Sequence, residues 1–573
     1  MHPRLRPSAN GLVTLLAAVA ACGGDPVGPN NSIQSPSVAC ASIPPVQLAV
    51  GQHVVVDPAT TSGCIRVPAA GASGAEYLLV LTSTAGTETQ NGVSGTYLLR
   101  GSNPSAAGAA VAAAPGLTPP VAGAWSPRGA DAQRRFDATL RSIERSLVAD
   151  PRLRGPQALP PAAPDAVPPP VGDQRTFRVC TNTTCTTFGS VTATAGFVGE
   201  HVAIYLDDDV PTNDPLTPAD LAELGTAFDT RHYPIDTTAF GRESDIDNNG
   251  VVIILMTDAV NALTPDCSDG RVVGYFFGAD LLVNFANSNK AEVFYTLVPS
   301  PQTSTCSAVT RRQAVNNLKP TLIHELQHMI SFNQHSLVRG GQQEETWLNE
   351  ALSHFAEELG GRLIPNSECT PAFTSCRSQY SGSNIVNLYD FMKEPEDNFL
   401  VFPATSGGTL EERGAVWAYL RWVLDQFAAD TILGRPTSRQ LVETSLQGVA
   451  NIVQVTGGSF STMVPQWLMA LYLDDQFTEP TGRLRFKSWG FRSIFLDPAN
   501  QAPGGPFSGF PLIPATTSGS YTRSGTLRAG TGHSLRLLQS ASGAAIDLQV
   551  RKSNAGDPLD QALAARFGLV RIQ

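Results

Sequence analysis

The sequence has little charge and no excess of basic residues. Charged residues make up 16% of the 573 residues, against about 25% in typical proteins, and the net charge is −11. Nucleic acids select a basic patch on their partners, and anionic lipid surfaces attract the same kind of charge. Neither is therefore an expected electrostatic partner. Serine, threonine, glycine and proline are abundant instead, which suits the surface of an exported protein.

Long apolar runs are also missing. Beyond the amino terminus, no stretch reaches the ~18 uninterrupted apolar residues of a membrane helix. The terminus itself carries two arginines in its first six residues and then an apolar run over residues 11–21, which is typical of a signal peptide. The run ends in V-A-A-C, which resembles a bacterial lipobox and implies cleavage before Cys22 and a lipid on its thiol. An ordinary signal peptide cleaved nearby is the alternative, and both interpretations export the protein.

The chain lacks C-x-x-C pairs, so a structural zinc cluster is not expected. It has nine cysteines, and eight remain when Cys22 is set aside. An even number in an exported protein indicates disulfides, which persist outside the cytosol. Because the eight cysteines fall into local pairs along the chain, we predict four bridges. These are Cys40–Cys64, Cys180–Cys185, Cys267–Cys306 and Cys369–Cys376.

The chemistry-bearing stretch is Thr321–His335, which contains an H-E-x-x-H motif. On a helix, His324 and His328 stand one turn apart on the same face, and Glu325 borders that face. Two imidazoles can therefore bind one metal ion beside a carboxylate base. The opposite face is apolar and can pack against a core. Because such a short motif also arises by chance, the alternative is that both histidines are buried, hydrogen-bonded helix residues.

A second amphipathic helix is predicted over residues 344–359. Its leucines and phenylalanine share one face, while Glu350, His354 and Glu357 share the other. Catalytic zinc needs three protein ligands and one open position, and Glu350 would complete a His-His-Glu set with the first helix. The rival three-histidine pattern, H-E-x-x-H-x-x-G-x-x-H, fails because serine and glutamine occupy its glycine and last histidine positions.

H-E-L-Q-H followed by W-L-N-E-A-L-S-H-F-A-E-E resembles the gluzincin metalloproteases, and most of all the hyicolysin family of secreted bacterial neutral proteases. The N-E-A-x-S core is similar to the third-ligand helix of thermolysin, and W-L-N-E followed by Glu357 is similar to that of the zinc aminopeptidases. The resemblance, strong over residues 310–360, implies His324, His328 and Glu350 as zinc ligands and Glu325 as the base. It implies Glu357 as a carboxylate behind the ligands.

The chain departs from these families in places. Thermolysin has a carboxylate where this chain has His354, and the G-x-M-E-N motif of the aminopeptidases is absent, which favours an endopeptidase. Relatives use a tyrosine or histidine to stabilise the oxyanion, and Tyr419, Tyr389, Tyr380 and His354 all remain candidates. Before the Arg413-Gly414 pair, the place of the aminopeptidase tyrosine is taken by glutamate.

The D-x-D-x-N-G sequence of residues 245–250 resembles the opening of a calcium loop. Its twelfth position holds Met256, however, where an EF-hand needs a bidentate glutamate. Asparagine and glycine serve turns equally well. We therefore favour a polar turn that enters a strand, with calcium as the alternative. The following segments, 274–282 and 291–297, should extend a mixed sheet, and the resemblance implies that its edge strand pairs with the substrate backbone.

Taken together, the patterns predict a multidomain α+β fold in which a thermolysin-like catalytic domain is flanked by two small β domains. Residues 102–172 are rich in alanine and proline. Within this segment, the spacing of residues over Asp131–Val148 predicts a helix. The predicted parts are a signal peptide (1–21), a lipid-anchored tether (22–38), a β-sandwich-like domain (39–101), a linker or removable pro-segment (102–172), a zinc metalloprotease domain (173–480) and a C-terminal β domain (481–573).

The predicted activity is zinc-dependent hydrolysis of peptide bonds in extracellular or periplasmic proteins. Glu325 would accept a proton from the zinc-activated water, and the lipid would tether the enzyme to a membrane of the cell envelope. The alternative is a surface-anchored binding protein on an inactive protease scaffold. Loss of a ligand or of the base would indicate the alternative, and none is lost.

Overall fold

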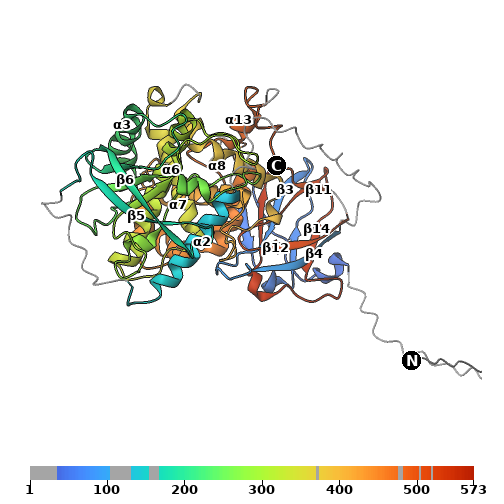
Figure 1. Cartoon of the computed structure of the whole chain (residues 1–573). Helices are drawn as coiled ribbons and strands as arrows, with labels where there is room; N and C mark the ends of the chain where they lie inside the picture. The colour runs from blue at the N-terminus through green and yellow to red at the C-terminus, as the bar shows by residue number, and fades with distance from the viewer. Residues whose placement is uncertain are drawn as a thin grey trace, which may run out of the picture.

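The computed structural model describes residues 35–102, 131–153, 167–369, 373–474, 476, 482–501, 505–517 and 520–573. Helices and a mixed sheet form one half of the molecule, and a two-sheet sandwich forms the other (Figure 1). The α+β class is as predicted. The predicted signal peptide and Cys22 lie outside the described residues. Within them, no helix is both long and apolar enough to cross a membrane.

Both ends of the chain build the sandwich. Its two sheets have the strand orders β1-β15-β3-β13-β11 and β12-β4-β14-β2. The expectation of two separate β domains is therefore wrong, because local patterns identify strands but not their partners. The strands are β1 (His53–Val56), β2 (Cys64–Val67), β3 (Ala75–Thr82), β4 (Ser94–Ser102), β11 (Ala515–Thr517), β12 (Tyr521–Arg528), β13 (Gly532–Gln539), β14 (Ile546–Arg551) and β15 (Arg566–Arg571).

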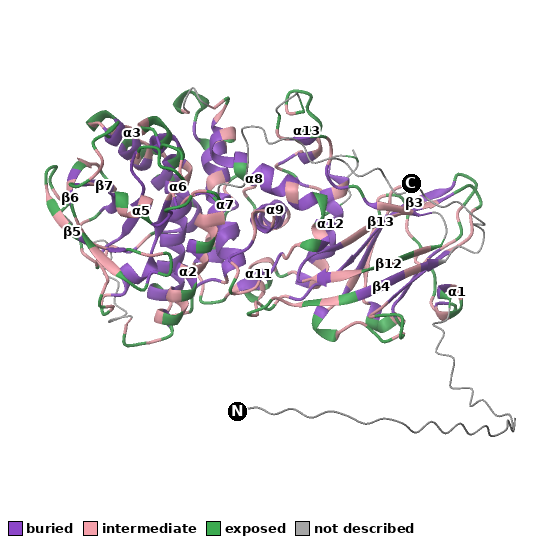
Figure 2. Ribbon diagram, turned by 45° about the vertical axis from the view of Figure 1, so that its right-hand side comes forward, coloured by how far each residue is buried: buried purple, intermediate pink, exposed green. Residues whose placement is uncertain are grey.

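Strand β3 joins the two halves. Alternate side chains of a strand point to opposite faces, and in β3 both faces are buried. Leu79 lies in the core between the two sheets, whereas Leu78 and Val80 belong to the core of the helical half. Helix α12 (Phe460–Leu473) covers that outer face, and Figure 2 shows buried residues running from the helices into the sheets.

The other half contains a six-stranded sheet with the order β5-β6-β7-β8-β10-β9. Strands β7, β8 and β10 run parallel, while β9 is antiparallel and lies at the edge. Every residue of β8, β9 and β10 is buried. The strands are β5 (Gln174–Cys180), β6 (Phe188–Val198), β7 (Val202–Asp207), β8 (Val252–Met256), β9 (Gly274–Phe276) and β10 (Val293–Thr296).

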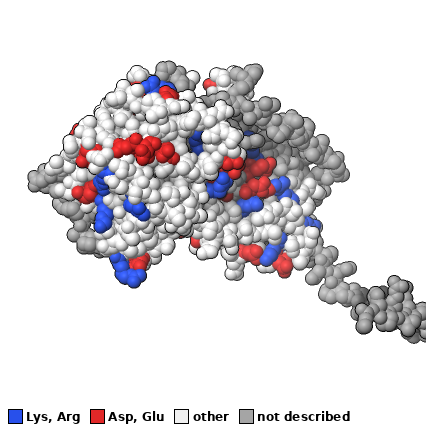
Figure 3. Space-filling view, viewed as in Figure 1, with Lys and Arg blue, Asp and Glu red and all other residues white. Residues whose placement is uncertain are grey.

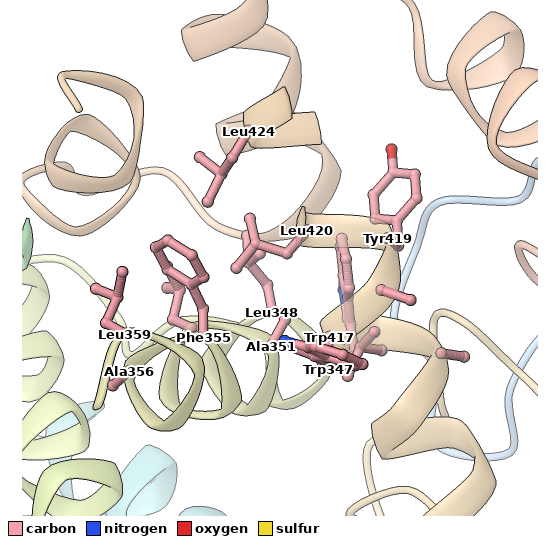
Figure 4. Close-up of a cluster of buried hydrophobic side chains, with 14 of the residues drawn as sticks. Trp347, Leu348, Ala351, Phe355, Ala356, Leu359, Trp417, Tyr419, Leu420 and Leu424 are labelled. Carbon is pink, nitrogen blue, oxygen red and sulfur yellow. The ribbon is translucent and has the colours of Figure 1, made fainter. Parts of the chain in front are cut away.

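Four long helices pack on one another next to this sheet, and α6 contacts β9 and β10. They are α6 (Arg311–Phe332), α7 (Thr346–Leu363), α8 (Cys376–Lys393) and α9 (Leu410–Phe427). Figure 4 shows Leu348 and Phe355 of α7 facing Leu420 of α9 in their shared apolar core. The remaining helices are α1 (Pro36–Ala39), α3 (Pro218–Ala227), α4 (Tyr233–Phe240), α5 (Asp258–Ala262), α10 (Thr437–Val442), α11 (Gly448–Thr456) and α13 (Phe491–Leu496).

Helix α2 (Asp131–Val148) spans the residues for which a helix was predicted, but it is not part of a linker. Phe136, Leu140 and Val148 are buried, and so are the charged Arg141 and Glu144. The linker interpretation is wrong for this segment, because composition indicated an exposed spacer while the helix has partners distant in sequence. Its flanks, residues 103–130 and 154–166, lie outside the described residues.

The four predicted disulfides are all present. They join Cys40 to Cys64, Cys180 to Cys185, Cys267 to Cys306 and Cys369 to Cys376. The first lies in the sandwich and the other three in the helical half. Most of the face shown in Figure 3 is uncharged; acidic side chains gather in one stripe on the helical half, and acidic and basic side chains lie next to one another toward the sandwich.

Candidate metal centre

Helix α6 carries the H-E-x-x-H motif and runs through an internal proline. Thr310 and Gln313 form a capping box that fixes its first turn. Pro320 cannot donate a backbone hydrogen bond to the carbonyl of Asn316. The side-chain amide of Gln379 from α8 donates to that carbonyl instead, at 3.2 Å. The helix therefore continues through the proline and presents its histidines one turn later.

Three side chains from α6 and α7 converge on one point. The Nε2 atoms of His324 and His328 are 3.1 Å apart. Glu350 Oε2 lies 3.7 Å from His324 Nε2, and Glu350 Oε1 lies 3.8 Å from His328 Nε2. Zinc bonds of roughly 2.0–2.2 Å in tetrahedral geometry separate donor atoms by about 3.3 Å. The three side chains thus fit one zinc ion.

Glu350 supplies an independent test of this fit. It is fully buried, and neither of its carboxylate oxygens has a hydrogen-bond partner among the described residues. A buried carboxylate without partners is costly. Arg413 Nη1 lies 3.3 Å from Oε2, but not in hydrogen-bonding geometry. A cation between Glu350 and the two histidines accounts for both free oxygens.

The outer nitrogens of the two histidines are held from behind. His324 Nδ1 lies 2.8 Å from Glu357 Oε1, while His328 Nδ1 lies 3.1 Å from Asn349 Oδ1 and 3.0 Å from Ser353 Oγ. Such contacts fix the ring orientation and leave Nε2 for a metal. In the N-E-A-x-S sequence of α7, the candidate ligand Glu350 thus stands between Asn349 and Ser353. These two residues orient a second candidate ligand, His328.

A second possible metal group consists of His324, His354 and Glu357. In this group both oxygens of Glu357 are already engaged, one with His324 Nδ1 and the other with His354 Nδ1 at 3.1 Å. The His-His-Glu350 group therefore fits a metal better, because its carboxylate oxygens are free.

Glu325 lies between this centre and the edge strand of the sheet. Its Oε2 accepts a hydrogen bond from the backbone N–H of Phe276 in β9, at 2.9 Å. Burial raises the pKa of Glu325 to about 8, with the charge of Asp137 acting in the same direction and that of His324 against it. The carboxyl is thus positioned beside the candidate ligands and has a raised proton affinity, as a general base requires.

The surroundings of the two histidines shift their pKa values in opposite directions. Burial alone would lower the pKa of His324, but Glu357, Glu325 and Glu350 together raise it to about 9. Burial and the positive charge of His324 lower the pKa of His328. The cluster of carboxylates therefore attracts one positive charge to this point, and a divalent metal ion would satisfy the same need.

The four candidate oxyanion donors lie in different surroundings. His354 is at the centre, with its ring 4.9 Å from that of His324 and its buried Nε2 without a hydrogen bond to any described residue. Tyr419 lies among the rings of Trp347, Phe460 and Trp467. The hydroxyl of Tyr389 contacts Ser508, and that of Tyr380 contacts His232. The structure therefore brings only His354, of these four, into contact with the candidate ligands.

Three charged residues at the centre were missed in the sequence. Arg413 of α9 contacts Glu350, and its Nη2 lies 3.4 Å from Asp137 Oδ2 in α2. Arg141 of α2 lies next to β9. The signal for Arg413 was the glycine after it: a Cβ at Gly414 would lie 2.3 Å from backbone atoms of α8, so glycine allows α9 to approach closely. No local pattern could have placed Asp137 or Arg141 here.

The centre is enclosed. His324, Glu325, His328 and Glu350 are 7%, 4%, 3% and 0% exposed. Helix α2 lies beside α7 in Figures 1 and 2, and Arg145 of α2 donates to Thr346 of α7 at 2.6 Å. In this conformation the site therefore offers little room to a polypeptide substrate.

Comparison with known proteins places the chain near a protease. No protein-family model matches it. Among curated proteins, it is similar to the neutral metalloprotease ShpI of Staphylococcus hyicus, with 33% identity over 148 residues. The matched stretch spans 25% of this chain and 32% of the relative, so the chain covers about a third of the relative's length. Together with a His-His-Glu group that could hold a metal ion, the match supports a relationship to metalloproteases.

Proposed function

We propose that this protein is a zinc-dependent endopeptidase of the gluzincin type, related to the hyicolysins. The observation that carries the proposal is that His324, His328 and Glu350 converge while neither buried carboxylate oxygen of Glu350 accepts a hydrogen bond from a described residue. Glu325 beside them supplies a base. A thermolysin-like arrangement also agrees with β9 as an antiparallel edge strand directly above the H-E-x-x-H helix.

In this mechanism His324, His328 and Glu350 would hold the zinc ion, which would supply Lewis-acid polarisation of the scissile carbonyl and of a water molecule. Glu325 accepts a proton from the attacking water and transfers it to the departing amine. His354 is our proposed oxyanion donor, because its buried Nε2 has no hydrogen bond to a described residue and lies 4.0 Å from Glu350 Oε2. Glu357 and Asn349 keep the ligand histidines in position.

We propose an extracytoplasmic location for this activity. The four disulfides and the signal-like amino terminus support export. A lipid on Cys22 would hold the enzyme at a membrane of the cell envelope. Mass spectrometry of the mature amino terminus tests this: a diacylglyceryl cysteine is expected, whereas an unmodified residue there leaves a secreted enzyme.

The zinc peptidase is tested with Glu325→Gln. The purified wild type should contain one zinc ion and cleave casein or a peptide pool internally. The variant should retain zinc and lose activity by about 10²–10⁴-fold, the usual contribution of a general base. Glu200→Gln, at an exposed carboxylate, is the matched control and should behave as wild type. A wild type that neither carries nor gains zinc contradicts the proposal, and a binding protein on an inactive scaffold would then be the better interpretation.

A further inference from the structure

A second cluster of carboxylates lies at the amino ends of the parallel strands. Asp245 and Asp247 belong to the loop that leads into β8, and Glu292 directly precedes β10. Strands β8 and β10 pair side by side, with Val293 opposite Ile253, so the loop and Glu292 meet. One carboxylate oxygen from each of the three residues lies within 4.8 Å of the others.

Glu292 makes this cluster different from an ordinary acidic loop. It is 1% exposed, and its Oε2 has no hydrogen-bond partner among the described residues. Its Oε1 accepts hydrogen bonds from Ser244 Oγ at 2.5 Å and from the backbone N–H of Ile246 at 3.1 Å. Those two bonds orient the carboxylate beside the loop and leave Oε2 without a donor among the described residues.

Asp247 repeats this arrangement. Its Oδ2 accepts hydrogen bonds from Arg175 Nη1 at 3.1 Å and Asn249 Nδ2 at 3.0 Å, while its Oδ1 is buried and accepts no hydrogen bond from the part of the chain that the structure describes. Arg175 is the only cation in an ion pair with the three carboxylates within the described part of the chain. The cluster therefore holds an excess of negative charge and two buried oxygens with no donor, and burial of such groups is costly unless a cation compensates.

We propose that Asp245, Asp247 and Glu292 bind a calcium ion. The donors are all oxygen, which favours calcium over zinc, whose protein sites normally include histidine nitrogen or cysteine sulfur. The loop has the D-x-D-x-N-G sequence but Met256 at its twelfth position, where a calcium loop carries glutamate. Glu292 supplies that carboxylate from the neighbouring strand. The preference for a simple polar turn followed from sequence spacing, which cannot reveal a ligand contributed from 36 residues further along.

The site is tested on the full chain, stripped of metal and reloaded with zinc alone. Titration with CaCl2 should show one saturable site, and calcium at 100 times its Kd should raise the Tm by about 5 °C. Glu292→Gln and Asp247→Asn should each abolish calcium binding while zinc content stays at one, which shows that the variants fold. Glu200→Gln is the control. Absence of saturable binding, or equal binding by wild type and both variants, overturns the site.

A second inference concerns α2 and rests on the proposed function. Side chains of α2 form hydrogen bonds with backbone carbonyls on the free edge of β9, the edge that is not paired with β10. Gln133 Nε2 donates to the carbonyl of Gly274 at 2.7 Å, and Arg141 Nη2 donates to that of Phe276 at 2.5 Å. Just beyond the strand, the N–H of Gly278 donates to Glu144 Oε1 at 2.6 Å. Because these side chains occupy an edge that a substrate backbone would use, α2 and an added peptide strand exclude each other.

We infer that α2 is an inhibitory segment of the protease. Asp137 of the same helix contacts Arg413, which in turn contacts Glu350, so the helix reaches the candidate metal centre as well as the edge strand. Excision of α2 would leave the sandwich assembled, because β3 and β4 are paired with strands from the other end of the chain.

The test inserts one recognition site for an added specific protease in residues 103–130 and another in 154–166. After both cuts, hydrolysis of a peptide substrate and affinity for a peptide hydroxamate should each rise at least tenfold, with zinc content unchanged. The uncut double-insertion protein is the control. Unchanged hydroxamate affinity after release of the helix overturns the inference. Tighter hydroxamate binding without any hydrolysis supports the inhibitory role of α2 but counts against the proposed peptidase.

Discussion

The sandwich and the helical half both have apolar cores, but they differ in how buried charge is balanced. Between the two sheets, Leu79 packs with Leu535 and Leu569. On the outer face of β14, the buried Asp547 is neutralised by Arg66 at 2.7 Å. Between α6 and α7, Glu350 has two buried oxygens that accept no hydrogen bond from any described residue. Buried polar groups normally find partners. In the sandwich the buried charge is balanced by protein groups alone, whereas between α6 and α7 it is balanced fully only by a bound cation. We call these two the complete and the incomplete core.

The largest expected effect is at the incomplete core. Glu350→Gln keeps the volume of the side chain but removes the charge that binds the metal. We expect loss of stoichiometric zinc and a decrease in peptide hydrolysis of at least ~10³-fold, because a catalytic metal contributes several kcal/mol. Zinc is measured by mass spectrometry and hydrolysis with a fluorogenic peptide. A variant that keeps its zinc would remove Glu350 from the ligand set.

A substitution in the complete core, that of the sandwich, should lower stability and leave zinc binding unchanged. Leu79→Ala removes a fully buried side chain of β3, and we expect a loss of about 2–5 kcal/mol in the free energy of unfolding with zinc content unchanged. Denaturant unfolding gives the stability and metal analysis gives the zinc. Val338→Ala, at a side chain 43% exposed, is the control and should change stability little. Zinc loss in Leu79→Ala would show that the two halves do not act independently.

A smaller effect on zinc affinity is expected at Glu357, which contacts the outer nitrogen of His324. Glu357→Gln weakens the contact that orients His324, and such changes reduce metal affinity by roughly 10–100-fold. Competition with a chromophoric chelator measures the affinity. Glu368→Gln, which alters a surface pair with Arg231, should leave zinc affinity unchanged. Equal affinities of Glu357→Gln and wild type would assign Glu357 a structural role only.

The smallest expected effect is on the pH dependence of stability, through His533 in the sandwich. Burial, together with the charge of Arg523, lowers the pKa of His533 to about 3 from its ordinary 6.5, against a weaker opposing effect of Glu394. The folded state therefore keeps this histidine neutral. Its contribution to stability is present above pH 6.5 and is lost as the pH falls toward 3. We expect the Tm of wild type to drop between pH 7 and pH 4.5 by about 2–4 °C more than that of His533→Gln, as measured by calorimetry. Equal drops would assign the acid sensitivity to other groups.

Much of the candidate site could be predicted because its signals are local. Helical spacing placed His324 and His328 on one face, and the polar face of the next helix supplied Glu350 and Glu357. The disulfides followed from pairing of cysteines close in sequence. Arg413 and Asp137 could not be predicted, because their contacts depend on how α2 and α9 pack, which spacing within one helix does not encode.

The sandwich shows the same limit on a larger scale. The short strands at both ends were recognisable from their apolar residues and turns, but nothing local indicates that β3 pairs with β13 and β15, more than 400 residues away. Glu292, which we propose as a calcium ligand, was missed for a related reason. Its role depends on the parallel pairing of β8 with β10 rather than on the loop that it completes.

The position of β15 between β1 and β3 has a consequence for biosynthesis. The first strands emerge long before their neighbours are made, and the first sheet closes only after Arg566–Arg571 has left the ribosome or export channel. Until then β1 and β3 keep open edges that other chains could join. A nascent chain that stalls before Arg566, or one that is cut there, would therefore be exposed to degradation or aggregation at β1 and β3.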